Sequence, residues 1–165
     1  MRTIVFIRHA KSLHPEYVSR DIERHLAARG YSDALESAKW CLSQKLVPDS
    51  LITSPAVRAY TTAMIFANVY AYPINKLVLH AAIYNAADEA LFYVLNEMDD
   101  KHQCVFVFGH NPGMTDVVNL LCGNVIGHLP TAGVAVVNVD CTSWSDIKPG
   151  TANLKTVFSN HKELE

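Results

Sequence analysis

The sequence predicts a three-layer α/β/α sandwich, with a mostly parallel central sheet and an antiparallel edge strand. Two observations predict this fold. Short apolar runs alternate with longer segments of helical periodicity, and two final strands follow one another closely. The run at residues 104–108 is apolar throughout, as expected for a central strand covered on both faces.

The first half of the chain alternates strand and helix. The apolar run Thr3–Ile7 predicts the first strand, and apolar residues at spacings of three and four predict a helix over Ala27–Lys45. Ser50–Thr53 is a short buried strand. Ser54 then combines a favoured N-cap residue with a proline at the first helical position, which predicts a helix over Pro55–Val69.

The second half continues the alternation and ends in two strands. Asp88 caps a predicted helix that ends at Met98, and Asn111-Pro112 repeats the cap-plus-proline signal for a helix through Leu121. The remaining segments are expected as strands: Lys76–His80, Cys104–Phe108, Gly133–Val139 and Asn153–Phe158.

The bulk composition is that of one globular domain, which we expect to span residues 1–165. Half of the residues are apolar and 18% are charged. The formal net charge of -2 argues against a general nucleic-acid binder. No apolar run reaches the length of a membrane span, and the apolar start is too short for a secretory signal. We therefore expect a cytoplasmic protein with no nucleic-acid or membrane partner.

Cysteine and histidine spacing predicts neither a metal site nor a cofactor site. The four cysteines, at 41, 104, 122 and 141, include no Cys-x-x-Cys pair, so we interpret them as small core hydrophobes. The eight histidines include no His-Glu-x-x-His pattern.

Basic side chains follow three of the predicted strands. They are the pair Arg8-His9, then Arg58 in the first turn of a helix, then His110. Because the carboxyl ends of parallel strands share one crevice, we expect these four side chains to converge. Arginine donors and helix N-termini together suit a phosphate group.

The two histidines of this site supply the chemistry. A neutral imidazole can attack phosphorus and carry a covalent phosphoryl group, and either histidine could do so. The positive arginines should keep His9 neutral, and their charge should stabilise the phosphoryl group in transfer. His110 is better suited to donating a hydrogen bond to that group.

Three ordered motifs carry a family resemblance: Arg8-His9-Ala10-Lys11-Ser12, Ser54-Pro55-x-x-Arg58 and Gly109-His110-Asn111-Pro112-Gly113. They resemble the histidine phosphatase superfamily, with its phosphoglycerate mutase-like fold, and the small size resembles the SixA-like branch of phosphohistidine phosphatases. The resemblance implies that His9 is the nucleophile and forms a phosphohistidine intermediate. It also implies that Arg8, Arg58 and His110 bind the substrate's phosphoryl group.

The chain departs from larger members of the family in ways that bear on its substrate. Pro15 stands where a phosphate-binding asparagine is common, and residues 80–85 contain no carboxylate where a glutamate proton donor is usual. A phosphate ester needs such a donor, because general acid catalysis typically contributes ~100 to ~10,000-fold. An imidazole leaving group departs more readily, so the missing acid favours phosphohistidine. The side chains of Asp88 and Glu89 could extend into the site from the nearby helix. Helix capping and a position on the solvent-exposed helix face are the better interpretations of these two residues.

The sequence thus predicts a metal-independent phosphatase that acts on phosphohistidine, in a protein, through His9. Two alternatives stay open: a phosphomonoesterase of the same fold that takes a small phosphorylated substrate, and a non-catalytic module that recognises phosphate. Lys11 and Ser12 either contact phosphate or face solvent.

Overall fold

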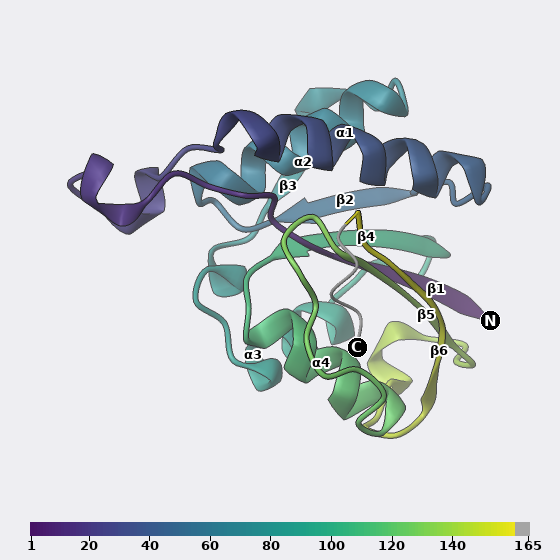
Figure 1. Cartoon of the computed structure of the whole chain (residues 1–165). Helices are drawn as coiled ribbons and strands as arrows, with labels where there is room; N and C mark the ends of the chain where they lie inside the picture. Colours follow the sequence, from purple (N-terminus) through teal and green to yellow (C-terminus); the bar gives the residue numbers. More distant parts are fainter. Residues whose placement is uncertain (161–165) are drawn as a thin grey trace.

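A computed structural model describes residues 1–160, and that part of the chain contains one six-stranded mixed sheet (Figure 1). The order across the sheet is β3-β2-β4-β1-β5-β6. The strand bounds are Arg2–Arg8 (β1), Ser50–Thr53 (β2), Val78–Leu79 (β3), Cys104–Gly109 (β4), Val134–Val139 (β5) and Ala152–Phe158 (β6). The domain expected over residues 1–165 includes residues 161–165, which lie outside this description.

The predicted sandwich with a mostly parallel sheet is confirmed. Strands β3, β2, β4 and β1 are parallel neighbours, whereas β5 pairs antiparallel with both β1 and β6. The reversed strand is therefore β5, one position inside the edge. Because the chain turns back a second time, β6 at the edge runs in the direction of β1.

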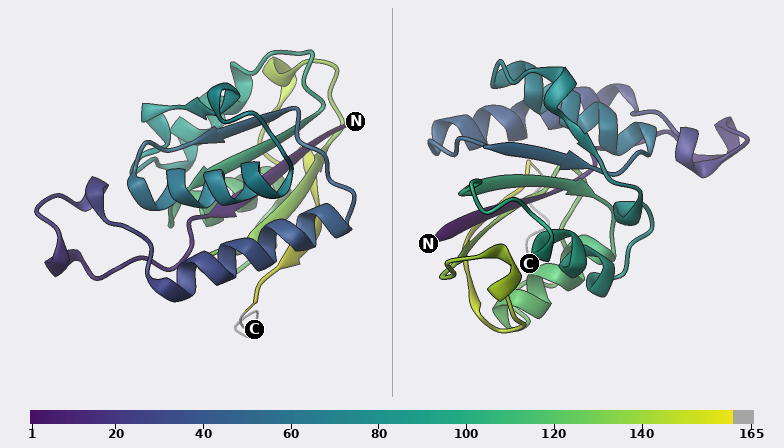
Figure 2. Two further views of the ribbon diagram at one scale, coloured as in Figure 1. Left: turned by 90° about the horizontal axis from the view of Figure 1, so that it is seen from above. Right: turned by 180° about the vertical axis from the view of Figure 1, so that it is seen from behind.

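Two helices cover each face of the sheet (Figures 1 and 2). Their bounds are Ala28–Ser43 (α1), Val57–Val69 (α2), Asp88–Asn96 (α3) and Gly113–Cys122 (α4). Side chains of β1 alternate between two buried clusters: Ile4 and Phe6 pack with residues of α3 and α4, and Val5 and Ile7 pack with residues of α1 and α2. This alternation explains why β1 is apolar throughout.

All four predicted helix starts are wrong by one or two residues, and α1 begins at Ala28 where Ala27 was predicted. Helix α2 begins at Val57, because Ser54 and Pro55 form a turn in which the Ser54 hydroxyl accepts from the backbone N–H of Ala56. Helix α4 begins after Pro112, which occupies the N-cap itself. In α3 the N-cap is Ala87 and Asp88 is the first helical residue. The side chains at the starts of α2 and α4 take part in the site described below.

Five short 3-10 turns complete the described elements, and the sequence patterns predict none of them. They are Pro15–Tyr17 (η1), Asp21–Glu23 (η2), Ile74–Lys76 (η3), Ala81–Ile83 (η4) and Trp144–Asp146 (η5).

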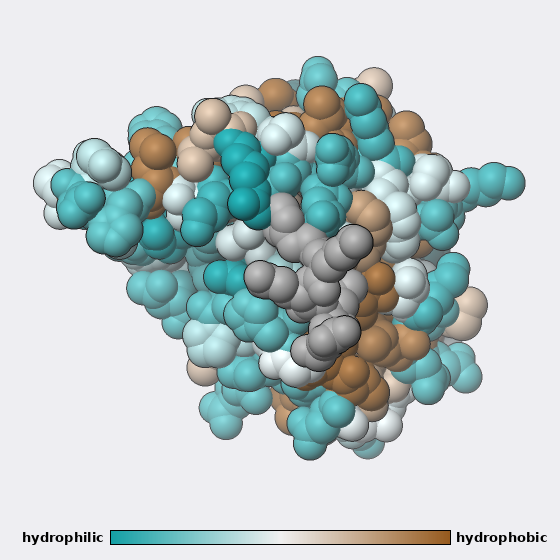
Figure 3. All heavy atoms as spheres, in the orientation of Figure 1, coloured by the Kyte–Doolittle hydropathy of each residue, from teal (hydrophilic) through white to brown (hydrophobic). Residues whose placement is uncertain are grey.

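The turns η1 and η2 belong to a projecting segment, residues 12–26, which we call the arm. An isolated antiparallel bridge between Ser12 and Leu26 joins its two ends. In Figure 2 the arm extends beyond the sandwich from the start of α1, and Figure 3 shows it as a mainly hydrophilic projection. No helix among residues 1–160 is long and apolar enough to cross a membrane.

Candidate active site

The carboxyl ends of β1 and β4, with Arg58 of the helix that follows β2, form one wall of a pocket of about 630 Å³. Strand β4 lies between β2 and β1, and Arg8 on β1 pairs with Gly109 on β4. The residue that follows each strand is a histidine, His9 after β1 and His110 after β4. The backbone N–H of His9 donates to the carbonyl of Gly109 at 3.0 Å. The pocket is lined by Arg8, His9, Lys11, Ser12, Leu13, His14, Pro15, Asp21, Arg24, Arg58, Tyr84, Asn85, His110, Asn111 and Thr131.

The four residues predicted for the site therefore come together. The rings of His9 and His110 have centroids 5.1 Å apart, and both residues are buried, as is Arg58. Arg8 is partly buried and lines the same pocket. Lys11 and Ser12 line it too, and Lys11 is exposed.

His9 has a defined tautomer. Its Nδ1 lies 2.8 Å from the backbone carbonyl oxygen of Ala10, and because a carbonyl oxygen only accepts, Nδ1 carries the proton. The lone pair of the neutral ring therefore lies on Nε2. An Nε2 lone pair within an anion pocket is the arrangement that nucleophilic attack on phosphorus requires.

Burial is the main reason why His9 is neutral. Removal from water lowers its pKa to about 3; the hydrogen bond to Ala10 opposes this shift, and the charges of His110, Arg58 and Arg8 add to it. The sequence analysis predicted that the charges of the arginines would be the main cause of this neutrality. That prediction is corrected, because burial is the larger cause. Neutrality at pH 7 is unchanged.

The loop that carries His9 is fixed by α1 and α2. The backbone N–H of Ala10 donates to the hydroxyl of Thr62, which in turn donates to the carbonyl of Arg58. At Gly30 near the start of α1, a Cβ would lie only 2.1 Å from the carbonyl oxygen of Lys11. A side chain at that position would push α1 away from the loop, so glycine is required there.

His110 is oriented by Ser54. Its Nε2 lies 2.8 Å from the Ser54 hydroxyl oxygen, which already accepts from the N–H of Ala56. The hydroxyl proton has no acceptor other than Nε2 among the described residues, so Ser54 donates to Nε2 and the proton of the neutral ring lies on Nδ1. Burial, followed by the charge of Arg58, lowers the pKa of His110 to about 4. His110 is therefore a neutral donor at pH 7.

Three buried donor atoms of the predicted site lack a hydrogen-bond partner within residues 1–160. They are Nδ1 of His110, Nε of Arg8 and Nε of Arg58. Buried donors are normally satisfied, so this concentration in one pocket indicates an anion with several acceptor oxygens. A tetrahedral phosphoryl group has that chemistry.

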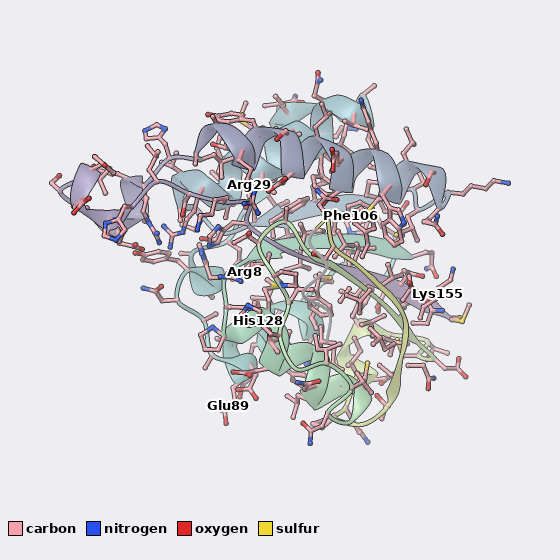
Figure 4. All side chains as sticks on the ribbon, viewed as in Figure 1. Arg8, Arg29, Glu89, Phe106, His128 and Lys155 are labelled. Atoms are coloured by element: carbon pink, nitrogen blue, oxygen red, sulfur yellow. The ribbon has the colours of Figure 1, made fainter. Side chains whose placement is uncertain are left out.

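Arg8 is held from the loop that precedes β5. One of its terminal nitrogens donates to the carbonyl of Leu129 and contacts Nε2 of His128, each at 3.1 Å. Arg8 and His128 lie close to each other in Figure 4. Asn111 binds the same carbonyl through its amide nitrogen, while its oxygen accepts from the N–H of Thr115. Asn111 thus joins this loop to the start of α4.

The structure adds residues that the sequence analysis did not place in the site. Asp21, on the arm, accepts from Arg58 at 2.9 Å and from the hydroxyl of Tyr84 at 3.0 Å, and forms an ion pair with Arg24. None of the three motifs in the sequence includes Asp21 or Arg24, so the sequence analysis had no signal for them.

Among residues 1–160, no carboxylate other than that of Asp21 lines the pocket. Residues 80–85 contain no carboxylate, and Asp88 and Glu89 line a different cavity beside α3. In Figure 4 Glu89 lies below Arg8, at the lower edge of the molecule. Within residues 1–160, no group of three or more His, Cys, Asp or Glu residues could hold a metal ion.

The fold and this pocket together define an α/β protein with an anion site at the carboxyl edge of its sheet. No family model matches the sequence. An uncharacterized chloroplastic protein of Arabidopsis thaliana is 25% identical over 88% of this chain and 70% of that protein.

Solved structures identify the fold more closely. A protein assigned as a phosphohistidine phosphatase SixA, from Agrobacterium tumefaciens, superposes with a TM-score of 0.82 at 22% identity, covering 96% of this chain and 97% of its own. The structure of the protein histidine phosphatase SixA complexed with tungstate has a TM-score of 0.81 at 19% identity, and the match covers 95% of this chain and 96% of that one. A mycobacterial glucosyl-3-phosphoglycerate phosphatase has a TM-score of 0.70 at 12% identity, and the match covers 94% of this chain and 97% of that one. The chain has the phosphoglycerate mutase-like fold of the SixA phosphatases, which confirms the predicted resemblance at the level of fold.

Proposed function

We propose that this protein is a metal-independent phosphatase that transfers a phosphoryl group to Nε2 of His9, with phosphohistidine in a protein as its substrate. The observation that carries the proposal is the pairing of a free Nε2 lone pair on His9 with the unpartnered donors of Arg8, Arg58 and His110 in the same pocket. Tungstate is a tetrahedral oxyanion, and a SixA structure of the same fold is complexed with it.

In the first step, Nε2 of His9 forms a bond to phosphorus while the P–N bond of the substrate breaks. The electron pair of that bond returns to the leaving ring nitrogen. The other nitrogen of the substrate imidazole is already protonated before the transfer, so the ring leaves as a neutral imidazole without a proton from the pocket. Arg8, Arg58 and Nδ1–H of His110 stabilise the charge on the phosphoryl oxygens. In the second step, water attacks the phosphorus while the P–Nε2 bond breaks. The electron pair of that bond returns to Nε2, the protons of the water leave with the inorganic phosphate, and His9 is again neutral with its proton on Nδ1.

The substrate class follows from the protonation states in the pocket. Asp21 is the one carboxylate among the described lining residues, and its contacts with Arg58, Arg24 and Tyr84 favour the ionised form. An ionised carboxylate cannot supply the proton that an alkoxide needs on leaving. An imidazole leaving group does not need it.

A phosphomonoesterase acting on a small molecule is the second candidate. The fold shared with glucosyl-3-phosphoglycerate phosphatase and the volume of the pocket favour it. The lack of a protonated carboxylate opposes it. A module that binds phosphate without catalysis has less support, because the nucleophile is intact and in the reactive tautomer.

We place the activity in the cytoplasm. All four cysteines are free in the structure, and free cysteines fit a reducing compartment.

The decisive experiment uses a histidine-phosphorylated protein carrying labelled phosphate. The wild-type protein should release phosphate and accumulate an acid-labile, alkali-stable phosphoenzyme, and the His9→Ala variant should do neither. Equal turnover by the two proteins would show that His9 is not the nucleophile. Phosphate binding by both proteins without turnover would favour the recognition module.

A further inference from the structure

Asp21 contacts the guanidinium of Arg58 through both its backbone and its side chain. Nη1 of Arg58 donates to the main-chain oxygen of Asp21 at 2.8 Å, and Nη2 donates to Oδ2 at 2.9 Å. The Arg58 side chain is only 4% exposed. A guanidinium held through two nitrogens by one residue has little freedom to rotate.

Asp21 is itself held from two other elements. The hydroxyl of Tyr84, just after η4, donates to Oδ2 at 3.0 Å, and Nη2 of Arg24 lies 3.1 Å from Oδ1. The Tyr84 ring packs edge-on against His110, with centroids 5.7 Å apart. The carboxylate therefore links the arm and the residues after η4 to the arginine of α2.

The charge state of Asp21 separates two possible roles. Burial alone would raise its pKa, but the hydrogen bond from Tyr84 and the charges of Arg58 and Arg24 outweigh this and lower it. At neutral pH the group is an acceptor, and it has no proton to donate to a leaving group. Its role at the site is therefore exerted through the donors that it binds.

These contacts leave the Nε edge of the Arg58 guanidinium without a hydrogen-bond partner among the described residues. Asp21 engages the two terminal nitrogens, whereas Nε has no partner within residues 1–160. We propose that Asp21 is the positioning residue of Arg58, fixing the terminal nitrogens so that the Nε edge is aligned with the phosphoryl group in the transition state. This inference rests on the proposed function, which supplies that group.

Positioning of this kind acts on the rate of the reaction. A donor that is already oriented needs no reorganisation when charge develops on the phosphoryl oxygens, so its loss appears mainly in kcat. If Asp21 instead acted as an internal anion competing with phosphate, its removal would tighten phosphate binding and leave kcat unchanged. The two roles predict opposite results.

The test is a double-mutant cycle of Asp21→Ala and Arg58→Ala, with phosphoimidazole as the substrate. Asp21→Ala should lower kcat about 30-fold in the wild-type background and less than about 2-fold in the Arg58→Ala background. Asp21→Asn keeps the main-chain contact and one side-chain oxygen, so it should restore most of kcat. The control is Glu23→Ala, which removes a carboxylate of the same turn that pairs with Arg20 and does not line the pocket.

Two results would overturn the inference: equal effects of Asp21→Ala in both backgrounds, or an unchanged kcat with tighter binding of inorganic phosphate. The same cycle measured by calorimetric titration with orthovanadate separates this inference from the proposed function. If phosphoimidazole is not turned over but the effects on vanadate binding are non-additive, the proposed function fails and the coupling of Asp21 to Arg58 stands. Additive effects on vanadate binding would refute that coupling.

Discussion

His9 and His110 face each other across neighbouring strands, with ring centroids 5.1 Å apart and a tilt of 54° between the rings. Each ring has one nitrogen fixed by a different partner, Ala10 for His9 and Ser54 for His110. The pair therefore presents one nitrogen with a free lone pair and one N–H donor. Two histidines with the same intrinsic chemistry have different roles because their partners differ.

The Ser54→Ala variant should lower kcat about 10-fold with little change in KM, because the hydroxyl that fixes the tautomer of His110 is lost. Steady-state kinetics with phosphoimidazole measure this effect. The matched control is Ser50→Ala, which removes a buried serine at the other end of β2. A similar loss in both variants would mean that the effect arises from destabilised packing.

Acidification should destabilise the protein between pH 6.5 and about 4. The folded-state pKa is about 3 for His9 and about 4 for His110, against an ordinary 6.5. In this range the unfolded chain binds protons that the folded protein does not, so the free energy of unfolding falls as pH falls. Each histidine should contribute roughly 1.4 kcal/mol per pH unit.

Urea unfolding at several pH values measures this dependence. In the His9→Asn variant the slope between pH 4.5 and 6 should be about half that of the wild-type protein. His25→Asn, which changes an exposed histidine of the arm, is the control and should keep the full slope. An unchanged slope in His9→Asn would contradict the burial argument.

An aryl phosphate should be hydrolysed at least ~100-fold faster than an alkyl phosphate. The reason is that the pocket supplies no protonated carboxylate, so the rate depends on how readily the leaving group departs as an anion. Comparison of kcat/KM for the two esters measures this ratio. Nearly equal rates would reveal a proton donor and support the phosphomonoesterase alternative.

Treatment with a chelator should leave turnover unchanged, because in the proposed mechanism arginine and histidine donors stabilise the phosphoryl charge. The measurement is activity on phosphoimidazole before and after prolonged dialysis against EDTA. Activity that falls on dialysis and returns with an added divalent cation would replace this mechanism with a metal-assisted one.

Local sequence patterns predicted most elements of the fold to within a few residues. Strand β2 has the predicted bounds, and α1 ends two residues before the predicted end. The predicted helix starts at Pro55 and Pro112 were wrong by one or two residues, because Ser54 and Pro55 form a turn before α2 and Pro112 occupies the N-cap of α4. The N-cap pattern marked both junctions, but it did not fix the first helical residue. What it could not predict is that the side chains of Ser54 and Asn111 also bind partners in the site region.

The sequence by itself determined the alternation of strands and helices and the identity of Arg8, His9, Arg58 and His110, since these depend on local periodicity and on motifs at strand ends. Only the tertiary structure decided the tautomers of the two histidines, the main cause of their neutrality and the place of Asp21 beside Arg58. The contact of Asp21 with Arg58 spans 37 residues, and that of Ser54 with His110 spans 56. Such contacts depend on strand register and on the path of the arm, and neighbouring residues in the chain do not encode either.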